Sequence, residues 1–258
     1  MRGRGGFKDR ARFRRGAYLI PSLFTTGNLL CGYIAVVRSI QGEFEWAAIA
    51  LFIAALLDRL DGWVARLTGT TSDFGVQFDS LADVISFGIA PALLAHIWAL
   101  SALPRPFSLA PFLYLATSAA RLARFNIQAP MQDKRYFVGL PTPAAACAIA
   151  ACVYYDPGRV ADPITAFLVM FLVVTLSVLM ISKVRYRSFK EIDLRRRVPW
   201  IVVILMALVY FVAAASPQLV ALVLSFTYLL SGLLPRLRSR GGRQEPRPAT
   251  VGGPHGGA

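Results

Sequence analysis

The chain has 258 residues, of which 56% are hydrophobic and 16% charged, and its formal net charge at pH 7 is +14. A soluble globular domain is about 45–50% apolar and about one quarter charged, so this composition excludes most soluble folds and also intrinsic disorder. The basic residues stand in short clusters between long apolar runs, whereas a nucleic-acid-binding domain gathers them on one face. We therefore expect an integral membrane protein with no nucleic-acid partner.

Eight apolar stretches are about as long as a helix needs to cross the roughly 30 Å hydrocarbon core of a bilayer. In chain order they are residues 17–37, 46–67, 80–100, 106–123, 137–155, 164–181, 198–215 and 217–234. The expected fold class is an all-α polytopic membrane protein. Its membrane domain covers residues 17–234, between a basic juxtamembrane segment at 1–16 and a Gly-, Pro- and Arg-rich tail at 235–258 that is expected to be disordered.

The positions of Lys and Arg predict the orientation, because positively charged loops stay in the cytoplasm. With a cytoplasmic N-terminus, the inner segments hold 25 of the 28 basic residues, and the outer loops hold only Arg38, Arg105 and Arg159. Both termini are therefore expected in the cytoplasm. The connection between the second and third spans is expected on the same side.

Four aspartates stand close to that connection. Asp58 and Asp61 are three residues apart and Asp79 and Asp83 are four apart, so each pair occupies one face of its helix. Antiparallel helices joined by a short connection bring these two faces together. Four neighbouring carboxylates repel one another unless a cation lies between them, and oxygen ligands favour Mg²⁺ or Mn²⁺. The spacing predicts a divalent-cation site.

Small residues and one cation accompany the acids. Gly62 and Gly75 each stand within one turn of an aspartate, and Ala65 extends the same small surface, so a bulky ligand can approach the backbone closely. Arg66, at the end of the second span, suits a phosphate or one of the acids. The alternative explanation for small residues in membrane helices is tight helix packing.

The pattern D-x2-D-G-x2-A-R-x8-G-x3-D-x3-D, complete from Asp58 to Asp83, resembles the signature of the CDP-alcohol phosphotransferases. The resemblance implies a polytopic enzyme in which an alcohol displaces CMP from a CDP-linked lipid with the help of two divalent ions. It implies metal binding by Asp58, Asp61, Asp79 and Asp83, with Asp83 also as the general base. It further implies a CDP site lined by Gly62, Ala65, Arg66 and Gly75.

Three further segments resemble the integral-membrane phosphatidylserine synthases of bacteria: residues 21–28, residues 121–126 with 139–144, and residues 186–190. The resemblance implies transfer from CDP-diacylglycerol to L-serine in the bacterial inner membrane, with the active site facing the cytoplasm, and a homodimer among membrane lipids. The candidate ligands for serine or for lipid phosphates are Asn28, Arg121, Arg124, Arg185, Arg187 and Lys190. The bias of positive charge toward the cytoplasm explains these cations equally well.

Two alternatives remain open. Another acceptor, first glycerol 3-phosphate and then inositol phosphate or choline, is the alternative within the family. A phosphorylated acceptor calls for a dense basic pocket, and the motif itself offers only Arg59 and Arg66. An ion-coupled transporter is the alternative from another class, because intramembrane carboxylates also mark ion paths. Transporters commonly contain two related halves, and residues 137–234 hold no counterpart of the acidic motif.

Overall fold

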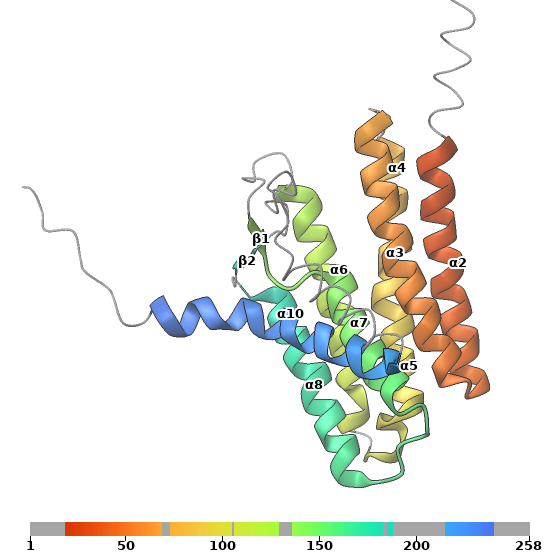
Figure 1. Ribbon diagram of the computed structural model, residues 1–258, viewed down its shortest axis with the longest axis vertical. Coiled ribbons are helices and arrows are strands. Elements are labelled where there is room, and N and C mark those ends of the chain that lie inside the picture. The colour runs from red at the N-terminus through yellow and green to blue at the C-terminus, as the bar shows by residue number, and fades with distance from the viewer. Residues whose placement is uncertain are drawn as a thin grey trace, which may run out of the picture.

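The computed structural model describes residues 19–68, 73–104, 106–128, 136–182, 185–187 and 215–239. This part of the chain forms long helices and one short antiparallel ribbon (Figure 1). The helices are α2 (Leu19–Gln41), α3 (Phe44–Thr68), α4 (Asp73–Asp83), α5 (Ala90–Trp98), α6 (Ala110–Gln128), α7 (Thr142–Tyr155), α8 (Pro163–Ile181) and α10 (Pro217–Ser239). A π-helical segment, η1 (Val84–Ile89), joins α4 to α5, and 3-10 turns η2 (Leu100–Ala102) and η3 (Phe107–Leu109) precede α6. The ribbon pairs β1 (Tyr136–Val138) with β2 (Arg185–Arg187).

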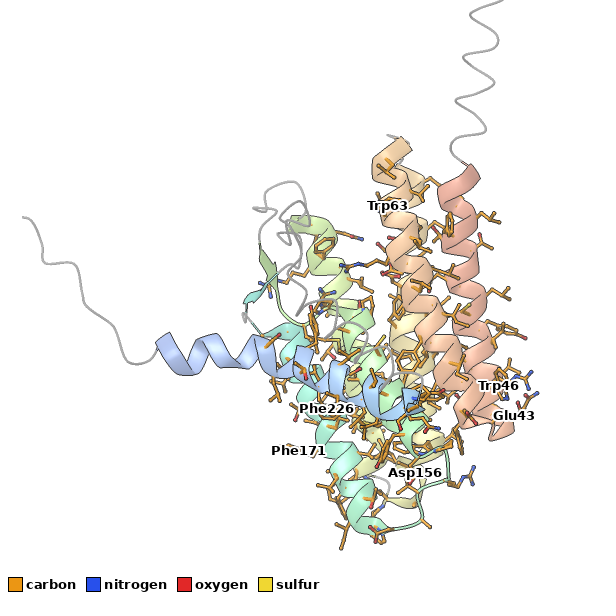
Figure 2. The ribbon with its side chains drawn as sticks, in the orientation of Figure 1. Glu43, Trp46, Trp63, Asp156, Phe171 and Phe226 are labelled. Atoms are coloured by element: carbon orange, nitrogen blue, oxygen red, sulfur yellow. The ribbon has the colours of Figure 1, made fainter. Side chains whose placement is uncertain are left out.

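The predicted helical membrane fold is confirmed in its main features. Three helical stretches are long and apolar enough to cross a membrane: Ser22–Gln41, Phe74–Trp98 and Pro163–Ile181. α3, with 25 residues, is also long enough for a crossing, but it carries the charged motif. Exposed tryptophans stand toward its two ends, Trp46 and Trp63 (Figure 2). They are separated by about 26 Å along the helix, close to the thickness of a bilayer core, and tryptophan is enriched at both membrane interfaces.

Two predicted spans need correction at their first residues. The third helical stretch begins at Asp73, not at residue 80, because its first turns are too polar to register as apolar sequence. The fifth begins at Thr142, not at residue 137. Phe137 instead pairs with Tyr186 in the ribbon, and Gly139 has φ +85°, a conformation that no helix continues.

Some predictions fall where the structure describes nothing. The basic segment at 1–16, residues 198–214 of the seventh span, and residues 240–258 of the tail lie outside the described residues. The tail was expected to begin at residue 235, but α10 continues to Ser239. The predicted boundary is therefore too early.

Small residues bring the helices of the bundle together. α3 packs between α2 and α7, and α6 packs on α8. Ala47, Ala48 and Ala54 of α3 and Ala145 and Ala148 of α7 are fully buried. Alanine lets helix backbones approach closely, which is how membrane helices gain packing energy without a hydrophobic driving force between them.

Large apolar side chains cover the outside of the bundle. Leu56, Phe112 and Phe171 are each at least 60% exposed, and Phe171 points away from α8 in Figure 2. Such faces are costly in water and are ordinary for helices that meet lipid. The inside of the bundle is thus closed by small residues and the outside is left apolar.

α10 does not lie alongside the neighbouring α8. Figure 1 shows it crossing the bundle at a steep angle to α8. Leu229 is buried in the core, and Phe226 and Tyr228 pack against it.

Candidate active site

Three carboxylates from two helices meet between α3 and α4. Asp58 and Asp61 from α3 and Asp79 from α4 each offer an oxygen atom, and these atoms all lie within 4.8 Å of one another. The helical spacing predicted that the two acidic faces would meet, because α4 begins soon after α3 ends. The structure places these three side chains together at that junction.

Asp83 lies one turn further along α4. It is outside the group of three oxygens, but its carboxyl group is within hydrogen-bonding reach of that of Asp58. Asp83 is 8% exposed and Asp61 is 5% exposed, so both are enclosed by protein. All four predicted acidic residues therefore belong to one site, with Asp83 at its inner edge.

The neighbouring helix α2 supplies hydrogen-bond donors to two of these carboxylates. Thr25 Oγ1 donates to Asp61 Oδ2 at 3.1 Å, and Asn28 Nδ2 donates to Asp83 Oδ1 at 3.2 Å. Thr25 and Asn28 are three residues apart, so they lie on one face of α2. Both donors are neutral, and they orient the carboxylates without cancelling their charge.

The donor set fits divalent cations. Asp79 Oδ1 is buried and receives no hydrogen bond from any residue the structure describes. The one ion pair in this part of the chain joins Arg38 to Glu43, away from the aspartates. A buried carboxylate oxygen needs a donor or a cation, and sites built only from oxygen ligands suit Mg²⁺ or Mn²⁺.

The predicted CDP-binding residues are only partly described. Gly62 directly follows Asp61 near the end of α3, and Gly75 lies in the first turn of α4, one turn before Asp79. Both glycines therefore border the acidic group. The side chains of Ala65 and Arg66 lie outside the described part of α3.

Arg121 of α6 also lies near the acids. Its guanidinium is largely buried and close enough to Asp83 to interact with it electrostatically. Nη1 makes a long contact of 3.5 Å with Thr142 Oγ1, while Nε is buried with no acceptor among the described residues. A buried guanidinium with an unused donor is suited to an anionic group of a ligand.

The structure describes the other predicted cations less completely. Arg124 is half-buried, one turn beyond Arg121 on α6. The backbones of Arg185 and Arg187 form the ends of β2, but their side chains, and all of Lys190, lie outside the described residues. Their roles remain predictions.

The sequence profile of the CDP-alcohol phosphatidyltransferase family matches residues 18–178. The chain belongs to this family. α2 through most of α8 fall inside the match, including the four aspartates and the helix that donates to them. The chain is accordingly an enzyme of a membrane family, and the transporter alternative is set aside.

The chain is also similar to individual proteins whose names state a reaction. The chain is 39% identical to a Helicobacter pylori protein named CDP-diacylglycerol–serine O-phosphatidyltransferase, over 75% of this chain and 82% of that one. It is 34% identical to a Bacillus subtilis protein of the same name, over 67% and 92%. A solved Mycobacterium tuberculosis phosphatidylinositol phosphate synthase has a TM-score of 0.47 at 22% identity, covering 66% of this chain and 90% of that chain.

Three polar residues near the CDP-alcohol phosphatidyltransferase site had no individual role in the sequence analysis. Thr25 donates to Asp61, and Ser86 donates to the backbone carbonyl of Asn28 on α2. Thr25 lies inside the resembling segment 21–28, which is a signal that points to it. Tyr228 of α10 lies within electrostatic reach of Arg59 and Arg121. No local pattern identifies Tyr228, because α10 reaches the site only through the tertiary fold.

Proposed function

We propose that this chain is a CDP-diacylglycerol–serine O-phosphatidyltransferase. It transfers the phosphatidyl group of CDP-diacylglycerol to the hydroxyl group of L-serine and produces phosphatidylserine and CMP. Relatives with that printed name, 34–39% identical over most of this chain, support the assignment. The structural observation that carries it is the Arg121 guanidinium, which lies within electrostatic reach of Asp83 and has a buried Nε without an acceptor among the described residues.

Divalent metal ions belong to this proposal. Asp58, Asp61 and Asp79 would hold them, with Asp83 as a fourth ligand, and Mg²⁺ or Mn²⁺ fits the oxygen donors. When bound, two such ions neutralise the charge that develops on the departing nucleotide and help to orient the reacting groups. Gly62, Ala65, Arg66 and Gly75 would line the CDP moiety beside them.

Asp83 takes the proton in the proposed reaction. Its carboxylate accepts the proton of the serine hydroxyl while the hydroxyl oxygen forms a new bond to the lipid phosphorus. The bond from that phosphorus to CMP breaks, and CMP leaves with the bonding electrons. Asn28 holds Asp83 Oδ1, so Oδ2 is the oxygen left to face the acceptor.

Arg121 explains why the acceptor carries a carboxylate. A guanidinium binds a carboxylate with two parallel hydrogen bonds, and in serine the carboxylate is only two carbons away from the reacting oxygen. Choline offers no anion for this arginine. A phosphate ester of glycerol or inositol carries about two negative charges and calls for further cations close by. Arg124, Arg185, Arg187 and Lys190 are proposed to bind either serine or the lipid phosphates.

The proposed setting is the bacterial inner membrane. The eight apolar stretches support eight spans, and the charge distribution supports placing both termini in the cytoplasm. In that orientation the site lies near the cytoplasmic interface marked by Trp63. Access from the cytoplasm suits serine and CMP, which are water-soluble. A homodimer is proposed from the family resemblance.

The assignment is tested with purified protein in detergent and CDP-diacylglycerol. Serine, glycerol 3-phosphate, inositol phosphate and choline are added one at a time, and CMP release and the lipid product are measured. Only serine is expected to give rapid CMP release. Rapid release with another alcohol and not with serine would refute the proposal.

A variant tests the role of Arg121 in the same assay. Arg121→Gln is expected to raise the KM for serine by about 10–100-fold, the usual loss for a charge-assisted hydrogen bond, with little change in the KM for CDP-diacylglycerol. The matched control is Arg159→Gln in the α7–α8 connection, which removes an exposed arginine. A rise confined to the KM for CDP-diacylglycerol would assign Arg121 to the lipid substrate instead.

A further inference from the structure

The Asn28 side chain is enclosed by protein and contacts the Asp83 carboxylate. It has 0% exposure, and its amide nitrogen donates to Asp83 Oδ1. Its amide oxygen is buried without a hydrogen-bond donor among the described residues. The contact of Asn28 with substrate or phosphate stays a prediction, whereas its bond to Asp83 is observed.

A second contact fixes the backbone of Asn28. Ser86 Oγ donates to the carbonyl oxygen of Asn28 at 3.0 Å, and Ser86 is also fully buried. Ser86 reaches α2 because Gly32 has no side chain. A Cβ at Gly32 would lie 2.4 Å from Ser86 Oγ and 2.7 Å from Ser86 Cα. The backbones of α2 and η1 are therefore in direct contact at this point.

The π-helical segment η1 follows Asp83 immediately. A π-turn widens the helix, changes the direction of the side chains beyond it, and occurs frequently at functional sites. Here both Asp83 and Ser86 meet the same residue of α2. From the other side, Tyr114 of α6 donates to the carbonyl oxygen of Phe87 at 3.1 Å. The segment that carries Asp83 is thus held from two helices.

We propose that Asn28, Gly32 and Ser86 form a clamp, here called the α2 clamp, that positions the Asp83 carboxylate for proton transfer. Asn28 is then a positioning residue that acts through Asp83. The inference rests on the proposed function only in taking Asp83 as the base.

The chemistry of the amide supports this role. A carboxylate with one oxygen fixed by a donor has its second oxygen aimed in a defined direction, and reaction rates depend steeply on such alignment. Lysine or arginine at position 28 would fix the carboxylate equally well, but its charge would weaken the carboxylate as a base. The amide of asparagine orients Asp83 and leaves its negative charge intact.

The first experiment removes the donor. Asn28→Ala is expected to lower kcat for phosphatidylserine formation by about 10–100-fold, the usual loss when a supporting hydrogen bond to a functional group is deleted. The KM values for serine and CDP-diacylglycerol are expected to change by less than about threefold, because the lost donor contacts Asp83 and the clamp assigns Asn28 no substrate contact. The matched control is Tyr114→Phe, which deletes a buried interhelical hydrogen bond to the same segment but not one to a carboxylate. Because this bond also holds the segment that carries Asp83, a second control is Ser177→Ala, which deletes a buried hydrogen bond to the Val173 carbonyl oxygen within α8. Ser177→Ala is expected to keep kcat near wild type and Tyr114→Phe to lose less kcat than Asn28→Ala, and thermal unfolding of all three variants is measured alongside.

Each other outcome overturns the clamp. A raised KM for serine at unchanged kcat would mean that Asn28 touches the substrate, and equal losses of kcat in all three variants would mean a general packing effect. If the Asn28→Ala variant does not accumulate in the membrane, the Ser86→Ala variant tests the clamp instead. It removes the hydrogen bond to the Asn28 backbone and keeps the Asn28 side-chain amide. An unchanged kcat in Ser86→Ala overturns the proposal.

Failure of the proposed function is distinguishable from failure of the clamp. Wild-type protein that releases CMP with another alcohol but not with serine refutes the acceptor assignment, and the clamp is then measured with that alcohol. If the wild type is active with serine and the Asn28→Ala variant is equally active, the clamp is refuted and the proposed function is not.

Discussion

Replacing Gly32 by alanine adds one methyl group at the closest approach of α2 to η1. The new Cβ would lie 2.7 Å from Ser86 Cα, a backbone atom that no side-chain rotation moves away. Raising this separation to the 3.4 Å of ordinary contact displaces α2 from η1 by about 0.7 Å. The same displacement would lengthen the bond from Asn28 to Asp83 from 3.2 Å to about 3.9 Å, beyond hydrogen-bonding distance.

The expected result is a loss of turnover that exceeds the loss of stability. A misplacement approaching 1 Å at a reacting group costs up to about 100-fold in rate, so kcat for Gly32→Ala is expected to fall by about 10–100-fold. The matched control is Gly27→Ala on the same helix. Its Cβ would meet only Leu57 Cδ1, at 3.2 Å, the end of a flexible side chain. Both changes gain the same helix propensity of about 1 kcal/mol, so that contribution cancels between them.

The assay is CMP release from CDP-diacylglycerol and serine at saturating concentrations, with thermal unfolding of each variant in detergent. Gly32→Ala should have a much lower kcat than Gly27→Ala, and KM values close to those of the control. Equal kcat values in the two variants would refute the reasoning, because the added methyl group would then have been absorbed without moving Asp83. A selective rise in the KM for serine would also refute it.

Three further predictions concern the metal site, the base and the orientation. Excess chelator should stop CMP release, and added Mg²⁺ or Mn²⁺ should restore it. The Asp58→Ala variant should stay inactive at every cation concentration. Undiminished turnover in chelator would contradict a metal site. Asp83→Asn should lower kcat by about 10²–10⁴-fold, the usual contribution of a positioned base, and should weaken CDP-diacylglycerol binding less than Asp58→Asn does. Near-normal turnover would exclude Asp83 as the base. In a cysteine-free background, a cysteine at Gly42 should react with an impermeant thiol reagent on intact cells and one at Thr70 should not, and the reverse labelling would contradict the orientation.

The meeting of the aspartates was predictable because helical geometry is local. Residues three or four apart share a face, and a short connection limits how far apart α3 and α4 can lie. For this reason the acidic group agrees with the sequence analysis, although the first residue of α4 does not. The two helices make few direct contacts, however, because both pack on α2, and spacing does not predict that arrangement.

The errors in the predicted spans have a different physical origin. Hydropathy measures how apolar a stretch is, and Phe137 counts as apolar whether it enters a helix or a strand. Its pairing with Tyr186 joins segments far apart in the sequence, which no local window detects. The start of α4 was missed for the opposite reason, since Gln77 and Asp79 lower the hydropathy of residues that are nevertheless helical.

The role of Asn28 was beyond sequence reasoning for the same reason. The resemblance of residues 21–28 pointed to Asn28 as a candidate ligand, but its partner Asp83 is 55 positions away. The contact exists because Gly32 lets η1 approach α2, and neither residue predicts the other by spacing. The resemblance therefore singled out the residue, while the partner required the fold.

The hydrogen-bond donors from α2 are uncharged, so they do not neutralise the negative charge of the aspartates. Thr25 and Asn28 hold two of the four carboxylates without adding positive charge, and no ion pair to these acids occurs among the residues whose side chains are described. Four ionised carboxylates in a nearly closed space repel one another strongly, and a fold that paired each with arginine would need no metal. Two divalent ions carry about four positive charges, enough to balance four carboxylates, and an ion would also satisfy the Asp79 oxygen that no described donor reaches. Exchanging Asn28 for lysine would shift that balance, so Asn28→Lys should weaken the response to Mg²⁺ in addition to lowering kcat, whereas Asn28→Ala should lower kcat alone.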